Sequence, residues 1–255
     1  MMSCILVFYL AIPGIDVGAL SARARSETNT SPIVQGTTDP DALYAKREDI
    51  GSAQQAANIW QSRLQQNPND FESAWKLARA SYWIGTQGPE PQRRATLEQG
   101  VTAGRTATRL EPNKAEGHMW LAASMGALAE SFGLRQGLKY RGEIRSELET
   151  VLRIDPAFEQ GSADRALGRW YYKVPGLFGG NKKKSEEHLR KSLTYDPQST
   201  ASHFFLAETL FELDRKADAM AELQKVIDGP VNPEWEPEDR EFKQQAAERL
   251  KKERK

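Results

Sequence analysis

The sequence predicts an all-α protein, a right-handed α-solenoid of stacked helix pairs with extended repeats. The first observation is a period, because similar phrases that end in proline recur at Pro68, Pro112, Pro156 and Pro197, at intervals of 44, 44 and 41 residues. The second is a leucine with a small neighbour after each proline, at Leu77-Ala78, Leu121-Ala122, Leu167-Gly168 and Leu206-Ala207. The third is helical periodicity of apolar residues from residue 40 onward. A repeat of this length is typical of arrays in which each unit buries its apolar face against the next.

The first 26 residues differ from the rest of the chain. Residues 4–12 form an apolar run that Pro13-Gly14 breaks, and small residues follow it. A short apolar run before small residues is typical of a secretory signal, and it is too short to span a bilayer as a helix. We expect residues 1–26 to be a signal peptide or N-terminal anchor, and the protein to be exported, periplasmic or envelope-associated. The alternative is a misassigned start, which would leave the protein in the cytoplasm.

The remaining elements follow in order. Residues 27–39 are polar and turn-rich and predict a linker, and Asp39-Pro40 then supplies an N-cap and a proline at the first helical position. Gly85 is expected to end one helix. Helices are expected over residues 40–48, 52–66, 69–84, 90–110, 114–131, 137–154, 159–173, 183–195, 199–213, 216–228 and 238–253. Residues 40–236 are expected to form the solenoid, as four helix pairs after a partial one, and residues 237–255 a C-terminal capping helix and basic tail.

Composition excludes several classes of site. Lys and Arg balance Asp and Glu at 35 each, so the chain has no net charge that would attract nucleic acid, and no nucleic-acid partner is expected. The single cysteine, Cys4, excludes an intramolecular disulfide and a multi-cysteine zinc site. Neither a catalytic Ser, His, Asp or Cys arrangement nor a cofactor-binding loop stands out. We therefore expect neither enzymatic activity nor a cofactor.

The best-preserved units resemble tetratricopeptide repeats (TPRs). Their first helix carries a leucine beside a small residue, then a small residue, an aromatic and a glycine at set distances. The first unit fits with Leu77, Ala80, Tyr82 and Gly85, and the third keeps Leu167, Gly168, Tyr171 and Tyr172. The usual repeat has about 34 residues, so the longer periods here predict a longer inter-helix loop or second helix.

Extended units of this kind are seen in two families that the chain resembles. Residues 42–47 and 75–83 resemble the periplasmic T component of tripartite ATP-independent transporters, and this resemblance implies an envelope complex. The other family is the regulators of microtubule dynamics, which the chain resembles in Trp120-Leu-Ala, Ala129-Glu-Ser-Phe-Gly133, Asp155-Pro156 and Leu167-Gly-Arg-Trp170. Together the two resemblances cover roughly residues 40–250.

Two groups of residues raise the question of a metal or anion site. His118 and His203 each lie six residues after a repeat proline, so we expect one structural position in two repeats, several helix layers apart. Neither has a cysteine or paired carboxylates beside it, and we expect no metal site. The loop 175–185 reads as an inter-helix connection turned by two glycines. Its alternative role is to present Lys182–Lys184 to an anionic group, beside an apolar tip.

The predicted function is a non-catalytic TPR-like scaffold for protein–protein interaction in the bacterial envelope, with an unidentified protein partner. The first helices of a solenoid line its concave surface, where aromatic side chains can form a groove, although most of the aromatics are expected to be core. The expected partner contacts are Trp75, Trp120, Trp170, Leu177 and Phe178. The alternative is a small-molecule-binding accessory subunit of a transporter, which encloses an apolar or anionic ligand.

Overall fold

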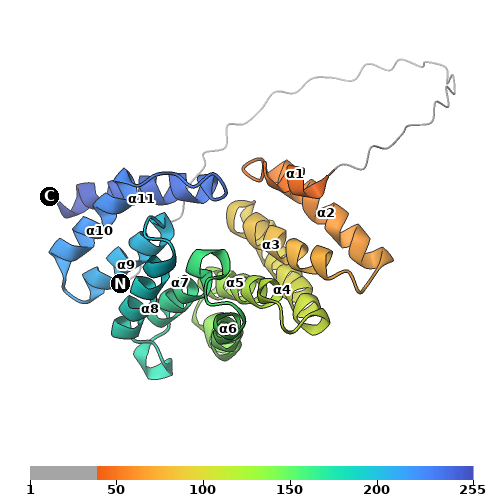
Figure 1. Cartoon of the computed structure of the whole chain (residues 1–255), viewed down its shortest axis with the longest axis horizontal. Helices are drawn as coiled ribbons and strands as arrows, with labels where there is room; N and C mark the ends of the chain where they lie inside the picture. Colours follow the sequence, from red (N-terminus) through yellow and green to blue (C-terminus); the bar gives the residue numbers. More distant parts are fainter. Residues whose placement is uncertain (1–38, 255) are drawn as a thin grey trace, which may run out of the picture. The chain divides into compact units, whose positions relative to one another are not determined.

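The computed structural model describes residues 39–254, which form eleven α-helices and two short 3₁₀ helices, with no strand in this part of the chain (Figure 1). The α-helices are α1 (Pro40–Tyr44), α2 (Ile50–Gln66), α3 (Phe71–Gln87), α4 (Arg93–Leu110), α5 (Ala115–Phe132), α6 (Leu134–Ile154), α7 (Phe158–Lys173), α8 (Lys182–Tyr195), α9 (Thr200–Glu212), α10 (Lys216–Asp228) and α11 (Glu236–Glu253). The 3₁₀ helices are η1 (Glu90–Gln92) and η2 (Gly176–Phe178). The predicted all-α fold is confirmed. The predicted signal segment and almost all of the predicted linker lie outside the described residues.

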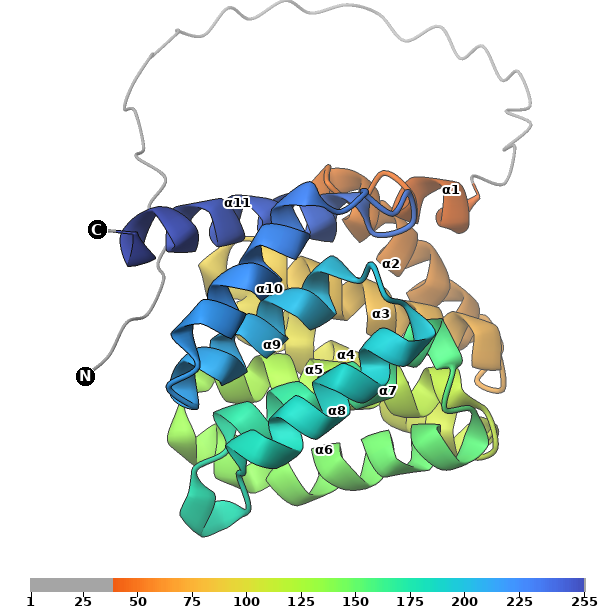
Figure 2. The same cartoon turned by 60° about the vertical axis from the view of Figure 1, so that its left-hand side comes forward.

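Helices pair in chain order, and the pairs stack into a solenoid. α3 packs on α4, α5 on α6, α7 on α8, and α9 on α10. The first helices of successive pairs also contact one another, α3 with α5, α5 with α7, and α7 with α9, whereas the second helices of the described pairs have no comparable mutual contacts. Because the first helices meet across repeats, they line the inner side of the curve and the second helices lie outside it (Figures 1 and 2).

The periodic prolines stand in the turns that separate one helix pair from the next. Each follows the residue that ends a second helix, and these C-cap residues (Asn67, Glu111, Asp155 and Asp196) are extended, with ψ between 77° and 99°. A residue before proline is pushed out of the helical region by the proline ring. The repeat period of the sequence is therefore the spacing at which second helices stop and the chain turns back.

The leucine-plus-small pairs form the layers of the core. The four leucines are at most 4% exposed, and the small residues beside them are buried as well. A small side chain is needed because the helices approach closely: a Cβ atom on Gly168 would lie 2.5 Å from Cγ of Leu189 in α8. This contact between a first and a second helix explains why the pattern marks each repeat.

Two local features differ from the sequence prediction. α3 does not end at Gly85 but continues to Gln87. Gly85 is buried inside the helix, and a glycine is needed there because a Cβ would lie 2.5 Å from Cγ of Leu97. In α7, Glu159, Gln160 and Gly161 have φ values of 43°, 58° and 77°, so the helix is interrupted directly after its first residue. Left-handed backbone costs a non-glycine residue about 1–2 kcal/mol, and tertiary packing must supply this energy.

The last helix closes the solenoid. α11 packs on α9 and α10, and its N-terminal end lies beside α1 (Figure 1). The Arg47 side chain, which follows α1, donates hydrogen bonds to the Glu238 carboxylate and to the Glu234 carbonyl oxygen. These contacts join residues that are 187 and 191 positions apart. The described helices therefore form a ring.

Candidate functional site

The inner surface begins with a stacked arginine on α3. The Arg79 guanidinium lies 4.3 Å from the ring centroid of Tyr44 and 4.9 Å from that of Trp75. Its nearest described carboxylate is that of Asp41, at 3.9 Å, and its Nε atom is buried without a hydrogen-bond partner among the described residues. Stacking between the two rings thus holds the Arg79 guanidinium in place, while not all of its N–H donors form hydrogen bonds within the described structure.

Tyr82 and Trp120 form an aromatic pair between α3 and α5. Their ring centroids are 5.8 Å apart, and burial raises the pKa of Tyr82 to about 12. Trp120 is 4% exposed, and its indole N–H has no partner among residues 39–254. A buried polar group without a partner costs free energy. Trp120 therefore packs beneath the inner surface, and its indole N–H makes no hydrogen bond within the described residues.

α7 supplies two charged groups of opposite sign, Glu159 near its start and Arg165 in its middle. Burial raises the pKa of the Glu159 carboxyl to about 7, although the positive charges of Arg165 and Arg79 act against this shift. Burial also lowers the pKa of the Arg165 guanidinium, and Glu159 acts against that change. Within the described part of the chain, neither side chain has an ion pair within 4.0 Å. Both groups remain available for a polar partner.

A chain of ion pairs crosses three first helices. Arg169 in α7 lies 3.2 Å from Glu130 in α5 and 2.5 Å from Glu208 in α9, and its guanidinium is 4.7 Å from the Phe205 ring. Burial opposes the charge of Arg169, but the two carboxylates prevail and raise its pKa. These ion pairs connect successive repeats, whereas Glu159 and Arg165 of α7 have no such pairs in the part of the chain that the structure describes.

The segment between α7 and α8 forms a second exposed feature. Leu177, at the tip of η2, is 90% exposed, and the Arg141 guanidinium lies 5.6 Å from the Phe178 ring. A Cβ on Gly180 would lie 1.6 Å from the Val174 carbonyl oxygen, so only glycine fits there. Trp170 is 8% exposed and donates its indole N–H to the Arg141 carbonyl oxygen at 2.9 Å. The exposed Leu177 therefore stands on a segment that Gly180 and the hydrogen bond of Trp170 hold in place.

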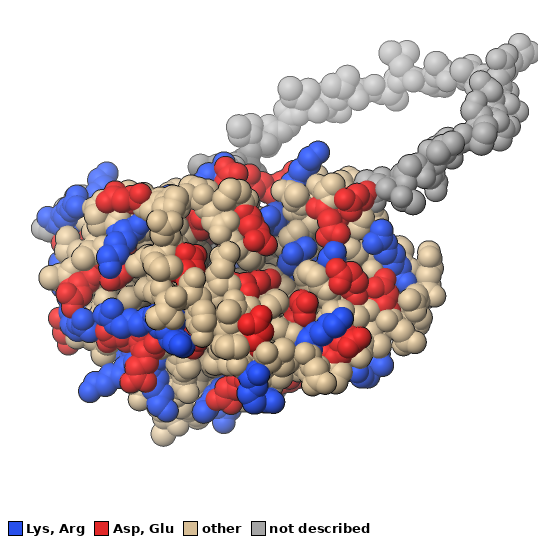
Figure 3. All heavy atoms as spheres, in the orientation of Figure 1, with Lys and Arg blue, Asp and Glu red and all other residues tan. Residues whose placement is uncertain are grey.

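Several cations surround this tip, and they have different roles. Lys182 donates to the Tyr172 carbonyl oxygen at 2.6 Å and lies over that ring, so it belongs to the fold. Lys183 and Lys184 are exposed at the start of α8. In Figure 3 the projecting segment after α7 stands at the lower edge, with basic and acidic side chains on either side. The rest of that face carries both signs of charge, interspersed.

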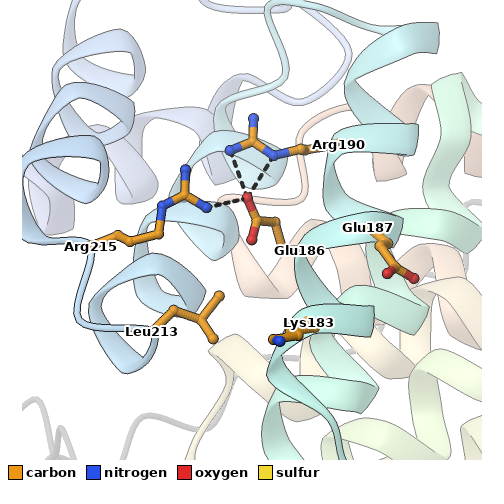
Figure 4. A pocket seen from close by; sticks show the side chains of 6 residues that line it. All are labelled: Lys183, Glu186, Glu187, Arg190, Leu213 and Arg215. Carbon is orange, nitrogen blue, oxygen red and sulfur yellow. Dashed lines mark hydrogen bonds and ion pairs between the residues drawn. The ribbon is translucent and has the colours of Figure 1, made fainter.

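An open depression lies between α8 and the turn from α9 to α10. Figure 4 shows Glu186 between Arg190 and Arg215, at 2.8 and 2.7 Å. Burial opposes the ionised form of Glu186, but its bonds to the two arginines lower its pKa. Since these charges satisfy one another, the depression is an inter-repeat ion-pair cluster.

The two histidines occupy equivalent positions and have the same two kinds of partner, as their spacing predicted. His118 lies 2.5 Å from Glu147 through Nδ1 and 3.0 Å from the Pro112 carbonyl oxygen through Nε2. His203 meets Glu222 and Pro197 at the same distances. Each histidine thus joins the turn before its helix to the second helix of the pair. No group of three potential metal ligands occurs in the described residues.

The structure separates the five predicted contact residues into two groups. Trp120 and Trp170 are core residues, whereas Trp75 is half-buried beside Arg79, and Leu177 and Phe178 form the tip after α7. Sequence reasoning missed Arg79, Glu159 and Arg165. Alignment of the repeats on their leucines could have found Arg79, because it and Arg169 each stand two residues after the repeat leucine. Glu159 carried no such signal, since it depends on the interruption of α7.

Stacked helix pairs whose first helices contact one another across repeats define a TPR-type helical repeat fold. The crystal structure of TTC0263, a thermophilic TPR protein of Thermus thermophilus, matches this chain with a TM-score of 0.62. The two sequences are 21% identical, and the match covers 83% of this chain and 97% of that one. The TPR resemblance seen in the sequence is confirmed at the level of the fold.

The chain belongs to the regulator of microtubule dynamics family. The family model for regulator of microtubule dynamics protein 1-3 matches residues 39–184, more than half of the chain. Regulator of microtubule dynamics protein 3 of Rattus norvegicus is 26% identical over 204 residues, which are 77% of this chain and 42% of the rat protein. The protein of the same name from Bos taurus is 28% identical over 137 residues, 53% of this chain and 29% of the bovine one. The chain thus spans less than half the length of these relatives.

These relatives overturn the predicted localisation. An exported, periplasmic or envelope-associated protein was expected from residues 1–26, which lie outside the described part of the chain. That prediction is wrong, because the matching family consists of regulators of microtubule dynamics and its curated members here come from mammals, whose cells have no periplasm. None of the described helices combines the length and apolarity that a membrane crossing requires.

Proposed function

We propose that this protein is a non-catalytic scaffold whose inner surface binds an extended segment of a partner protein. The observation that carries the proposal is that Glu159 and Arg165 are both partly buried and that neither forms an ion pair in the described structure. A desolvated charge without a partner is costly, and a partner's side chains and peptide groups would offset that cost. The partly satisfied edge of Arg79 supports the same conclusion.

Trp75, Leu177 and Phe178 are the proposed aromatic and apolar contacts. Trp75 stands beside Arg79 at the inner surface, and Leu177 and Phe178 form the tip between α7 and α8. Trp120 and Trp170 are buried, so we assign them the role of holding the contact residues in position. Exposed apolar side chains rimmed by polar groups mark interaction sites more often than isolated ones do.

The names of the relatives suggest that the scaffold acts in the regulation of microtubules. Regulator of microtubule dynamics protein 3 is the curated match in rat and cow, and we propose that this chain also contributes to regulating microtubule dynamics. Lys183 and Lys184, which are exposed at the start of α8, suit an acidic surface on the partner. Because the chain covers 42% of the rat protein, the remainder of that protein has no counterpart in this comparison.

Co-sedimentation with polymerised microtubules tests this proposal directly. Most of the double variant Leu177→Ser/Phe178→Ser should fail to co-sediment with microtubules. Val231→Ser should co-sediment like the unsubstituted protein, because Val231 is also exposed but lies before α11 and away from the tip. Binding should weaken as salt rises, since charge attraction is screened. Absence of sedimentation, or equal sedimentation of the two variants, would contradict the proposed role of the tip.

A second experiment tests the inner surface. For a captured protein partner, Arg165→Ala should reduce the affinity at least tenfold, whereas Arg105→Ala, which breaks an exposed pair with Glu143, should not. Native mass spectrometry of the purified chain tests the alternative of a small-molecule-binding subunit. A stoichiometric small molecule without any protein partner would favour that alternative, and turnover of any substrate would overturn both.

A further inference from the structure

The two ends of the solenoid meet at one side chain. Arg47 lies in the turn after α1, and its Nη2 atom donates to Glu238 Oε2 and to the Glu234 carbonyl oxygen, both at 2.7 Å. Its Nε atom is 3.3 Å from the other oxygen of Glu238. The backbone carbonyl of Arg47 accepts a hydrogen bond from the Trp83 indole N–H at 2.7 Å. Arg47 therefore connects α3 and α11 through opposite ends of one residue.

Aromatic rings surround the Arg47 guanidinium. The ring centroids of Tyr44, Trp83 and Trp235 lie 5.4, 5.3 and 6.0 Å from it. Its side chain is 8% exposed. Trp235, which precedes α11, is the C-terminal residue that packs against the N-terminal apolar cluster. We call this group, Tyr44, Arg47, Trp83, Trp235 and Glu238, the seam.

Apart from the packing of Trp235, the contacts around the seam are polar. Arg240 in α11 pairs with Glu48 at 2.5 Å, with both side chains more than half exposed, and Gln87 lies 3.3 Å from Glu241. α11 does not pack along α1, α2 or α3 as helix on helix, whereas every consecutive helix pair does. Exposed ion pairs contribute little to stability, whereas apolar packing between helices contributes much. The seam is therefore the junction of the ring with the least packing of helix on helix, and it depends mainly on Arg47 and Trp235.

The seam also adjoins the inner surface. A cleft of about 220 Å³ opens there, lined by residues of α1, by Arg79 of α3 and by Pro233, Glu234 and Trp235 of the segment before α11. Arg79 thus belongs both to this cleft and to the stacked group of the inner surface. Separation of the seam would widen the cleft and give a polypeptide lateral access to the first helices.

We propose that the seam is a latch: the ring opens and recloses between Arg47 and α11, and the open form admits an extended polypeptide to the inner surface. Threading a chain through a closed ring requires a free end, whereas a latch lets an internal segment enter from the side. The opening itself is a property of this fold and holds whatever the inner surface binds. Its test therefore stands apart from that of the proposed function.

A distance measurement across the seam tests the latch. With Cys4 replaced by serine, spin labels on Asn58→Cys in α2 and Ala247→Cys in α11 occupy exposed positions on either side. Pulsed electron–electron double resonance should show a main short distance and a minor longer one. Arg47→Ala should increase the longer population at least tenfold, because it removes three hydrogen bonds and the ring-stacked charge. Arg105→Ala, which breaks an exposed pair outside the seam, should leave the distribution unchanged.

A milder variant keeps the proposal falsifiable if Arg47→Ala does not fold. Glu238→Gln retains the shape of the side chain and removes its charge, and it should also increase the longer population. In the unsubstituted ring, 1 M salt should act in the same direction, since the Debye length falls from about 10 Å at 0.1 M to about 3 Å. A single short distance in all variants that fold, at both salt concentrations, would overturn the latch.

Discussion

Replacement of Glu159 by glutamine should stabilise the fold at neutral and alkaline pH. Burial raises the pKa of this carboxyl from 4.5 to about 7, so the folded protein disfavours the ionised form that the unfolded chain adopts freely. A displacement of this size corresponds to about 3 kcal/mol at most, at about 1.4 kcal/mol for each pKa unit. Glutamine keeps the shape and the left-handed backbone demand of the residue while it removes the charge, so the gain should approach that limit.

The stabilisation should depend on pH in a defined window. Below pH 4.5 the carboxyl is protonated in both states, and the two proteins should be equally stable. Between pH 4.5 and 7 the folded state holds more protons than the unfolded state, so the stability of the unsubstituted protein falls as pH rises. Above pH 7 the difference should reach its full value and stay constant.

Urea unfolding at pH 4, 5.5 and 8 measures this difference. Glu187→Gln is the matched control, because Glu187 is exposed on α8 and its substitution should change stability by no more than about 0.5 kcal/mol at any of these values. The m values should agree among the proteins. If Glu159→Gln is neutral or destabilising at pH 8, then Arg165 and Arg79 already compensate the carboxylate in the fold, and the argument from burial fails.

Four further outcomes are expected. The hydrogen bond between His118 and Glu147 raises the pKa of His118, although burial acts against this shift. The stabilisation by this pair should therefore be complete below pH 6.5 and be lost as pH rises through the raised pKa. In urea titrations the destabilisation caused by Glu147→Gln should shrink between pH 6 and 9, and a pH-independent difference would contradict this. Gly104→Ala should destabilise by at least about 1 kcal/mol, because the new Cβ would lie 2.8 Å from Cα of Leu121. By contrast, Gly126→Ala should stabilise the fold by about 0.5–1 kcal/mol, because the new Cβ would have no neighbouring group within 4 Å and alanine favours the helix. Calorimetry should therefore give Gly126→Ala the higher melting temperature of the two glycine variants. Leu206→Ala removes a fully buried side chain and should cost about 2–5 kcal/mol in chemical denaturation, with a smaller loss indicating that the core relaxes into the space.

Features set by neighbouring residues could be predicted well. The helix ends at Asn67, Glu111, Asp155 and Asp196 follow from the proline after each, because the proline ring acts on the backbone of the residue before it. The equivalence of His118 and His203 also followed from their common offset. Such features need only a few consecutive residues and the repeat register, and both are visible in a single sequence.

The candidate site was predicted less well, because burial depends on the neighbouring repeat. Trp75, Trp120 and Trp170 look alike in the sequence, yet only Trp75 remains half-buried, while the other two fill the space between helices. Leu177 and Phe178 were identified as a tip because the glycines that turn their loop are local. The unpaired state of Glu159 and Arg165 could not be foreseen, since it depends on how far each lies from charges on other helices.

The sequence by itself determined the helical class, the period of the repeats and the pairing of helices, because each of these depends on residues that are near one another along the chain. The tertiary structure alone decided that the solenoid closes into a ring. Arg47 and Glu238 are 191 positions apart, and nothing in the residues around either one indicates the other. Their meeting follows from the small turn that each helix pair adds to the last. Such a curvature accumulates over the whole array and becomes a contact only when all the repeats are in place.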